Sequence, residues 1–486
     1  MCGIVAYIGK KEAFPIVLSG LKRLEYRGYD SAGVALLKEG EINIFKKEGK
    51  VSNLESHVVG KDITGNRAIG HTRWATHGPP NDKNAHPHFS ESGDLAVVHN
   101  GIIENYDVIK QELESRGYVF KSDTDTEVLS YLISDIKKKT GFKLAKSVRL
   151  ALQQVVGAYA IVVMSKDEPN KLVAARKSSP LVLGIGKDND FYVASDATPI
   201  VEYTKQVVYL NDGDIAILNE EKGLKLYDHE EDLKDPYIEE LELQLEALEK
   251  GGYDHFMLKE IHEQPRSIED CFRGRLNASE GWVSLGGIKY YEDAIIKANR
   301  IVMVACGTSW HACLVGEYLF EDLARINVEV EYASEFRYRN KVVAPNTLFV
   351  TISQSGETAD TLACLSAAED AGYLARLGIC NVPSSSLARE SDLVFLTKAG
   401  PEIGVASTKA FTTQLVGLLM LTLILGRHHG LSSAAENTIN NSLRALPDSL
   451  DSVMKLENEI IEMAQDFDQK EHALFLGRGI HYPVAM

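Results

Sequence analysis

Cysteine is scarce in this sequence, and its few positions follow no pattern. The chain has no CxxC pair and no regular cysteine spacing; its six cysteines stand at positions 2, 271, 306, 313, 364 and 380. Disulfide-rich domains and cysteine-ligated zinc sites need several cysteines at close, regular spacing. The pattern argues against both and predicts reduced thiols, as in the cytoplasm.

Long hydrophobic runs are also missing. The most apolar segment, residues 415–425, is shorter than the roughly 20 residues that a membrane-spanning helix needs. The N-terminus lacks the basic stretch and apolar run of a secretory signal. We therefore expect a cytoplasmic protein that does not bind a membrane.

Positive charge is in deficit. The 52 basic and 69 acidic residues give a net charge of −17, which disfavours a nucleic-acid partner or an anionic membrane surface. The net charge does not exclude a local basic pocket that binds one phosphate. We therefore expect small-molecule partners. A chain of 486 residues with 44% hydrophobic and 25% charged residues is long enough for two or three globular domains.

Short strands dominate the first 220 residues. Apolar runs between Gly, Asp and Asn turns predict strands, and two helical patterns interrupt them at residues 13–24 and 126–138. This mixture predicts antiparallel sheets with helices packed outside them. The clearest predicted strands are residues 3–8, 33–37, 95–98, 158–164 and 214–218.

An acidic stretch separates this part from the rest. Residues 228–249 contain ten acidic residues and one lysine, which is typical of a solvated helix or linker. We predict a first domain over 1–220, an acidic linker over 221–260, a second domain over 261–435 and the incomplete start of a third over 436–486.

In the second domain apolar strands alternate with small-residue turns and amphipathic helices. This order predicts a doubly wound parallel sheet whose ligands bind beyond the carboxyl ends of the strands. A further strand is predicted at residues 472–476, and because the chain stops at Met486 we expect most of a third core to be absent. The alternating segments are strands 300–306, 346–353 and 376–381 and helices 310–323, 359–371 and 409–425.

Cys2 is the first candidate catalytic residue. A cysteine at an arbitrary position is most often buried and unreactive, but a small residue at position two makes Met1 removable. The freed α-amine, with an ordinary pKa of about 7.7–8.0, can act as a base for the adjacent thiol. The predicted strand 3–8 would hold this nucleophile rigidly.

Four motifs around this position resemble N-terminal-nucleophile glutaminase domains. They are residues 1–5 (MCGIV), 26–33 (YRGYDSAG), 70–78 (GHTRWATHG) and 99–105 (HNGIIEN). The resemblance covers residues 1–220 and implies a four-layer αββα sandwich with Cys2 as the nucleophile. Glutamine carries a carboxylate, an ammonium and an amide, so a selective site needs a cation, an anion and oxyanion donors.

The resemblance also implies roles for single residues. Asn100 and Gly101 would form the oxyanion hole, and Trp74 would gate a passage for ammonia. The residues implied to bind glutamine are Arg73, Thr76, His77 and Asp125. The histidines at 71, 77, 86, 88 and 99 have no metal-site spacing, so we expect scattered structural histidines and no metal.

Two Ser/Thr-rich turns stand between strands and helices of the second domain. Residues 306–309 (CGTS) and 353–358 (SQSGET) supply hydroxyls and backbone N–H groups at helix N-termini, where phosphate binds favourably. Such turns often only cap helices, but two in equivalent places favour a phosphate site.

These turns, with residues 253–261 (YDHFMLKEI) and 404–412 (GVASTKAFT), are similar to the sugar isomerase (SIS) domains of glutamine:fructose-6-phosphate aminotransferases. The resemblance implies formation of glucosamine 6-phosphate and glutamate from fructose 6-phosphate and glutamine, without a cofactor, by a homodimer. The residues implied to bind the sugar phosphate are Ser353, Gln354, Ser355 and Thr358, with Thr308, Ser309, Val405 and Ser407 lining the sugar site.

The sequence departs from that family at its end. The later isomerase residues, a Glu and Lys on a helix, a His and a C-terminal Lys, have no counterparts before Met486. We therefore expect a fragment with an incomplete synthase site. Two alternatives stay open: the glutaminase half of another amidotransferase, and a sugar-phosphate sensor without turnover.

Overall fold

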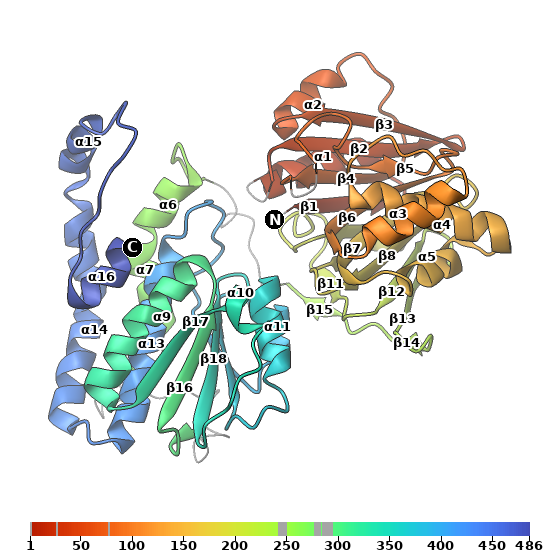
Figure 1. Ribbon diagram of the computed structural model, residues 1–486. Helices are drawn as coiled ribbons and strands as arrows, with labels where there is room; N and C mark the ends of the chain where they lie inside the picture. The colour runs from red at the N-terminus through yellow and green to blue at the C-terminus, as the bar shows by residue number, and fades with distance from the viewer. Residues whose placement is uncertain (1, 26–27, 76–77, 242–249, 277–282, 284–294) are drawn as a thin grey trace. The chain divides into compact units, whose positions relative to one another are not determined.

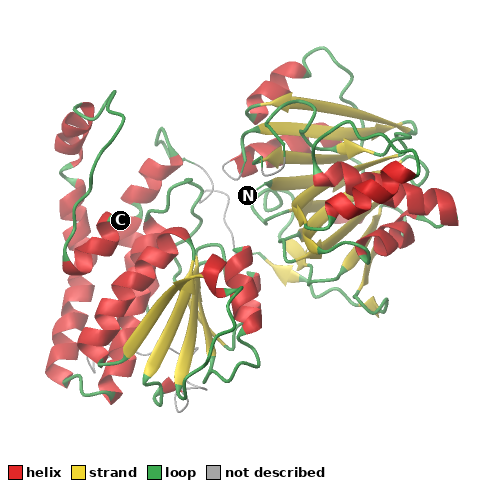
Figure 2. Ribbon diagram, in the orientation of Figure 1, coloured by secondary structure: helices red, strands yellow, loops and turns green. Residues whose placement is uncertain are grey.

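In the computed structural model of the protein, the chain divides into two units, residues 1–248 and 249–486 (Figures 1 and 2). The structure describes residues 2–25, 28–75, 78–241, 250–276, 283 and 295–486. Each unit has its own sheets and its own hydrophobic core.

Unit 1 contains two antiparallel sheets. The order of the eight-stranded sheet is β15-β11-β9-β10-β1-β4-β2-β3, and that of the seven-stranded sheet is β14-β13-β12-β8-β7-β6-β5. The first comprises β1 Gly3–Ile8, β2 Ser31–Lys38, β3 Glu41–Glu48, β4 Arg67–Arg73, β9 Val182–Ile185, β10 Phe191–Ala194, β11 Gln206–Tyr209 and β15 Glu239–Glu240; the second comprises β5 His88–Phe89, β6 Leu95–Ile103, β7 Gly157–Ser165, β8 Lys171–Lys177, β12 Ile215–Asn219, β13 Gly223–Tyr227 and β14 Leu233–Lys234.

The two sheets pack face to face with helices outside. Side chains such as Ile4 and Ala6 of β1 and Val98 of β6 belong to one buried cluster between the sheets. A second cluster joins the outer face of the β6 sheet to α3, α4 and α5. This is the αββα sandwich that the resemblance implies. The helices of unit 1 are α1 Ala13–Leu24, α2 Val51–His57, α3 Tyr106–Ser115, α4 Asp125–Thr140 and α5 Leu144–Leu152, with a short 3-10 turn at Lys187–Asn189.

Strand β1 and helix α1 have the bounds that the sequence predicts. All six residues of β1 are buried, because β1 lies in the middle of its sheet with α1 against one face and the second sheet against the other. The acidic region differs from the prediction. Residues 223–240 form β13, β14 and β15, which extend both sheets of unit 1. The remaining acidic residues, 242–249, lie outside the described part of the chain.

Unit 2 is built on a parallel sheet with strand order β17-β16-β18-β19-β20. Helices α7, α9, α13 and α14 share the large buried cluster, and α10 and α11 pack on the other face. This is the doubly wound arrangement that the alternating pattern predicts. The strands are β16 Arg300–Ala305, β17 Asn327–Tyr332, β18 Thr347–Ser353, β19 Arg376–Cys380 and β20 Leu393–Leu396; the helices are α6 Phe256–His262, α7 Gln264–Phe272, α9 Gly307–Leu319, α10 Ala333–Phe336, α11 Ala359–Ala367, α12 Ser386–Glu390, α13 Lys409–His428, α14 Ser433–Met454, α15 Glu457–Gln465 and α16 Tyr482–Ala485, with a π-helical turn at Phe320–Ala324 and a 3-10 turn at Gly479–His481.

Helix α13 is longer than the apolar run that marks it in the sequence. By length and composition its 20 residues could cross a membrane, but 78% of its most apolar window is buried inside the unit. It packs against α7 and α9, so its hydrophobicity is accounted for by the core of unit 2.

The strand expected at residues 472–476 does not form. Leu474, Phe475 and Leu476 are exposed and have no strand beside them in the described structure, and an isolated strand leaves its backbone groups unpaired. The preceding helix α14 also differs from the predicted start of a third domain. Leu443 of this helix is buried in the same cluster as the sheet of unit 2.

Candidate active site

Cys2 stands immediately before β1, at the edge of a small pocket in unit 1. The backbone N–H of Trp74 donates to Cys2 Sγ at 3.3 Å, and this contact follows from the pairing of β1 with β4, in which Gly3 is opposite Thr72. Burial raises the pKa of the Cys2 thiol, whereas the Trp74 N–H, the N-terminal charge and Arg73 lower it.

The pocket gathers five of the eight residues predicted for the glutaminase site. It is lined by Cys2, Arg73, Trp74, His86, His99, Gly101, Thr124, Asp125 and Thr126. Asn100 reaches the same place, since its Nδ2 donates to the carbonyl oxygen of Cys2 at 3.1 Å. Thr76 and His77, also predicted to bind glutamine, lie outside the described residues.

Gly101 follows Asn100 on β6 and cannot be replaced without strain. Its φ is +125°, which side chains rarely adopt, and a Cβ at this position would lie 2.0 Å from the carbonyl oxygen of Ala158 on β7. The backbone at Gly101 thus approaches its neighbouring strand more closely than any side chain permits.

His71 fixes the orientation of the Asn100 amide. Its Nε2 lies 3.0 Å from the carbonyl oxygen of His99 and 2.9 Å from Asn100 Oδ1. A carbonyl only accepts, so Nε2 carries the proton and the Asn100 atom facing it must be the amide oxygen. The Asn100 NH₂ group is therefore directed to the Cys2 side.

Four histidines that the sequence suggested to be scattered lie together at the pocket, and two of them, His86 and His99, line it. The ring centroids of His71 and His86 are 4.2 Å apart, and those of His86 and His88 are 4.8 Å apart. The fourth, His99, shares the hydroxyl of Thr126 with His86. Burial lowers the pKa of His71 to about 3 and those of His86 and His88 well below their ordinary value, so these rings are neutral.

Asp125 is the first residue of α4 and lies on the pocket wall. Its Oδ2 accepts the backbone N–H of Ile103 at 2.9 Å and lies 3.9 Å from His99 Nδ1. An N-cap precedes it: Thr124 accepts the N–H of Glu127, and Glu127 Oε2 accepts the N–H of Ser122, two residues before the cap, at 2.6 Å. These two contacts fix the start of α4 and the turn before it, and with them the carboxylate of Asp125.

Arg73 is the last residue of β4, and its guanidinium is the positive charge of the pocket. Its guanidinium is buried and donates to the carbonyl oxygens of Gly78 at 3.3 Å and Pro79 at 3.4 Å. Asp30, from the 26–33 motif, bonds to the backbone of Arg73 and of Ala75. Its N–H donates to the Arg73 carbonyl at 3.0 Å, and its Oδ2 accepts the N–H of Ala75 at 2.8 Å.

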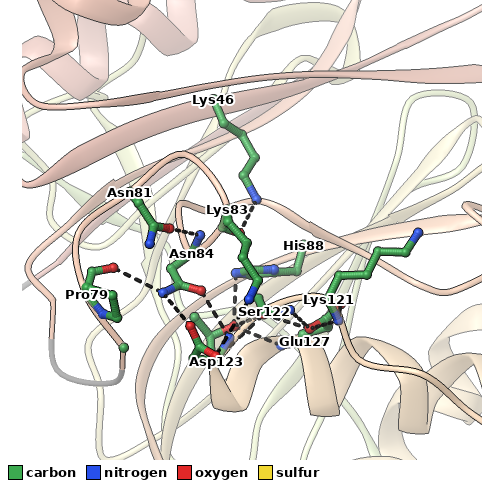
Figure 3. A network of polar contacts seen from close by, with 12 residues as sticks. Lys46, Pro79, Asn81, Lys83, Asn84, His88, Lys121, Ser122, Asp123 and Glu127 are labelled. Atoms are coloured by element: carbon green, nitrogen blue, oxygen red, sulfur yellow. Dashed lines mark hydrogen bonds and ion pairs between the residues drawn. The ribbon is translucent and has the colours of Figure 1, made fainter.

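A polar network holds the segment that follows Arg73 against the start of α4 (Figure 3). Asn84 Nδ2 donates to the Pro79 carbonyl and to Asp123 Oδ2, both at 3.1 Å, while Asn84 Oδ1 accepts the N–H of Asp123. Lys46 Nζ donates to the carbonyl of Lys83 at 3.2 Å. The two parts of the pocket wall are thereby tied together.

In unit 2 the 353–358 turn is held by hydrogen bonds between its own residues. Ser353 Oγ accepts the N–H of Gly356 at 3.1 Å and lies 2.9 Å from Thr358 Oγ1, and Ser355 Oγ accepts the N–H of Glu357 at 3.2 Å. Gly356 has a φ of +66°, and a Cβ there would lie 2.1 Å from Ser385 Oγ. Hydroxyls and N–H groups are thus concentrated in one turn; Gln354 within it is half-buried.

The 306–309 turn lies beside it. It follows β16, and β16 pairs in parallel with β18, which ends at Ser353. The strand order reverses between β16 and β18, and ligands of doubly wound folds bind at the carboxyl ends there. Thr308 is exposed at this edge, whereas Ser309 is buried and accepts from Gln414 Nε2 at 3.1 Å.

Val405 and Ser407 stand on the loop between β20 and α13. Val405 is 76% exposed, and Ser407 Oγ donates to Glu402 Oε2 at 3.1 Å. Because Gln414 of α13 contacts Ser309, the start of α13 is held against the start of α9. The predicted sugar residues therefore come from three segments at one end of the sheet.

Comparison with known proteins covers both units. A family model described as a glutamine amidotransferase domain matches residues 71–202, and a SIS domain model matches residues 294–424. Glutamine:fructose-6-phosphate aminotransferases (isomerizing) of Bacteroides thetaiotaomicron and of Chlorobaculum tepidum are each 52% identical to this chain, over all of it and over 79% of their own lengths. The solved C-terminal domain of glucosamine-fructose-6-phosphate aminotransferase from Francisella tularensis is 45% identical, with a TM-score of 0.47, over 49% of this chain and 66% of that one.

Proposed function

Since the chain belongs to the glutamine:fructose-6-phosphate aminotransferase (isomerizing) family, we propose that it transfers the amide nitrogen of glutamine to fructose 6-phosphate. The products are glucosamine 6-phosphate and glutamate. The observation that carries this proposal is the pocket in which Cys2 meets a cation, an anion and an oriented amide donor. Unit 1 is the glutaminase domain in this proposal, and unit 2 is the sugar-phosphate domain.

Glutamine binding would use the two charged residues of the pocket. Arg73 would bind the α-carboxylate in place of the carbonyl groups of Gly78 and Pro79, and Asp125 would bind the α-ammonium. Thr76 and His77 stay predicted substrate contacts. Both charges are buried, so each ion pair with the substrate would form with little competition from water.

Hydrolysis would begin with attack of the Cys2 sulfur on the side-chain amide carbon. Removal of Met1 places the α-amine on Cys2, where it can take the thiol proton and pass it to the leaving nitrogen. The carbonyl oxygen becomes an oxyanion that Asn100 Nδ2 and the Gly101 N–H would stabilise. Ammonia departs past Trp74, and water releases glutamate from the thioester.

The sugar phosphate would bind at the carboxyl ends of β16 and β18. The residues proposed for the phosphate are Ser353, Gln354, Ser355 and Thr358, and those for the sugar are Thr308, Ser309, Val405 and Ser407. Ammonia would add to C2 of the open-chain ketose with loss of water, and movement of a proton from C1 would give the aldose. We further propose a cytoplasmic homodimer.

The decisive experiment follows nitrogen from glutamine labelled with ¹⁵N in its amide. We expect glutamate release, and Cys2→Ala should lower its rate by about 10⁴-fold or more. Cys271→Ala, which removes a buried thiol from the core of unit 2, is the control and should retain hydrolysis. Hydrolysis by Cys2→Ala at an undiminished rate would contradict the proposed nucleophile. Measurement of ¹⁵N in glucosamine 6-phosphate tests the transfer step, and we expect the label to appear there.

A further inference from the structure

The 253–261 motif has no role in the chemistry described so far. Most of it forms α6, and Glu260 on this helix is only 2% exposed. A carboxylate buried to this extent must be compensated by hydrogen bonds or charges, because its desolvation is costly.

Glu260 holds the backbone of the loop that carries Val405 and Ser407. Its Oε1 accepts the N–H of Ile403 at 2.5 Å and the N–H of Gly404 at 2.9 Å. Its Oε2 is buried without a hydrogen-bond partner among the residues that the structure describes. A Cβ on Gly404 would lie 2.5 Å from this oxygen, so the close contact depends on the glycine.

A second carboxylate holds the other end of the loop. Glu402 Oε1 accepts the N–H groups of Thr408 at 2.9 Å and of Ala410 at 3.0 Å, at the start of α13. The loop is therefore fixed at residues 403–404 by α6 and at residues 408–410 by its own glutamate. Between residues 401 and 410 only Val405 and Ala406 are exposed.

We propose that Glu260 is a positioning residue for the sugar-phosphate site. By holding the N–H groups of Ile403 and Gly404, it sets the path of the backbone that presents Val405 and Ser407 beside the 306–309 turn. The inference rests on the proposed function of unit 2. It assigns the 253–261 motif a specific task, which is to bind a loop of the sugar site rather than the sugar itself.

The test compares Glu260→Gln and Glu260→Ala with the unaltered chain. Calorimetry measures the Kd for fructose 6-phosphate, and hydrogen exchange measures protection of the Ile403 and Gly404 amides. Since hydrogen bonds to a charged acceptor are strong, Glu260→Ala should raise the Kd about tenfold or more, with Glu260→Gln between it and the unaltered chain. Both amides should exchange faster. Glutamine hydrolysis without sugar should keep its kcat, which a general loss of folded protein would lower.

Glu269→Gln is the matched control, because Glu269 is an exposed carboxylate on α7 that contacts Arg273 and should change neither measurement. Gly404→Ala provides a second check: it should weaken sugar binding in the unaltered chain but add little to Glu260→Ala. Unchanged sugar affinity in Glu260→Ala, with faster amide exchange or without it, would overturn the inference alone. Failure of the unaltered chain to bind fructose 6-phosphate would overturn the proposed sugar function and the inference with it.

Discussion

The Nε2 atom of His71 donates to Oδ1 of Asn100 at 2.9 Å and to the carbonyl oxygen of His99 at 3.0 Å. This pair of bonds determines which end of the Asn100 amide faces Cys2. The proposed oxyanion donor is therefore oriented by a residue that does not itself line the pocket.

Loss of this contact should slow turnover without weakening glutamine binding. His71→Leu removes the N–H and frees the Asn100 amide to rotate, so we expect kcat for glutamine hydrolysis to fall about 10- to 100-fold at nearly constant KM. His71→Gln can place an N–H near the same point and should recover most of the rate. Equal losses in both variants, or a change confined to KM, would show that His71 does not act through Asn100.

Asp125→Asn should mainly affect glutamine affinity. The substrate ammonium would lose its buried anion, and truncation of such a pair costs enough to raise KM about 30-fold or more. An amide oxygen can still accept the Ile103 N–H, so the fold should persist. The control substrate is 4-carbamoylbutanoate, which is glutamine without its α-amine. A similar loss with that substrate would refute a specific role in ammonium binding.

Gly101→Ala should destabilise unit 1 more than a glycine substitution at an open position in the left-handed region, because its φ of +125° lies outside that region. Gly93 has a φ of +64° with nothing within 4 Å of a built Cβ, so Gly93→Ala reports the backbone strain alone, about 1 kcal/mol. Gly101→Ala adds the collision with the Ala158 carbonyl, and we expect at least about 2 kcal/mol more. Urea unfolding of both variants measures the difference, and equal values would contradict it.

The buried histidines should make unit 1 sensitive to acid. The pKa of His71 is about 3 in the folded state, below its ordinary value near 6.5, so between these values the unfolded chain binds the proton and the folded chain does not. The stability due to this difference is complete above pH 6.5 and is lost as pH falls, by about 1.4 kcal/mol per pH unit. At pH 5 the loss from His71 is about 2 kcal/mol.

Urea unfolding at pH 7 and pH 5 tests this expectation. His86 and His88 have lowered pKa values from the same cause and should add to the loss. His71→Gln has no titrating group at this position, so its unfolding free energy should fall by about 2 kcal/mol less between the two pH values. An identical fall in the variant would mean that His71 is not the source.

Local sequence patterns were sufficient for much of the fold. The unbroken apolar run of residues 3–8 and the 3.6-residue periodicity of 13–24 predicted β1 and α1 with the observed bounds. By contrast, residues 223–240 looked like an acidic linker yet complete both sheets as β13–β15. Edge strands carry charge on their exposed face, so composition alone does not separate them from a linker.

Some residues of the candidate site were also predicted from the sequence, and others were not. Motif resemblance predicted Cys2, Arg73, Asn100, Gly101 and Asp125 for one site, and the structure places all five at one pocket. His71 was missed because its partner Asn100 lies on another sheet, and nothing in the spacing of the histidines indicates that their rings meet.

The sequence by itself determined the kinds of element and the types of residue that glutamine and phosphate chemistry require, because these depend on local periodicity and on side-chain identity. Tertiary structure alone decided that His71 orients Asn100 and that Glu260 holds Ile403 and Gly404. These contacts join segments far apart in the chain, and their geometry depends on strand register and helix packing, which no short stretch of sequence encodes.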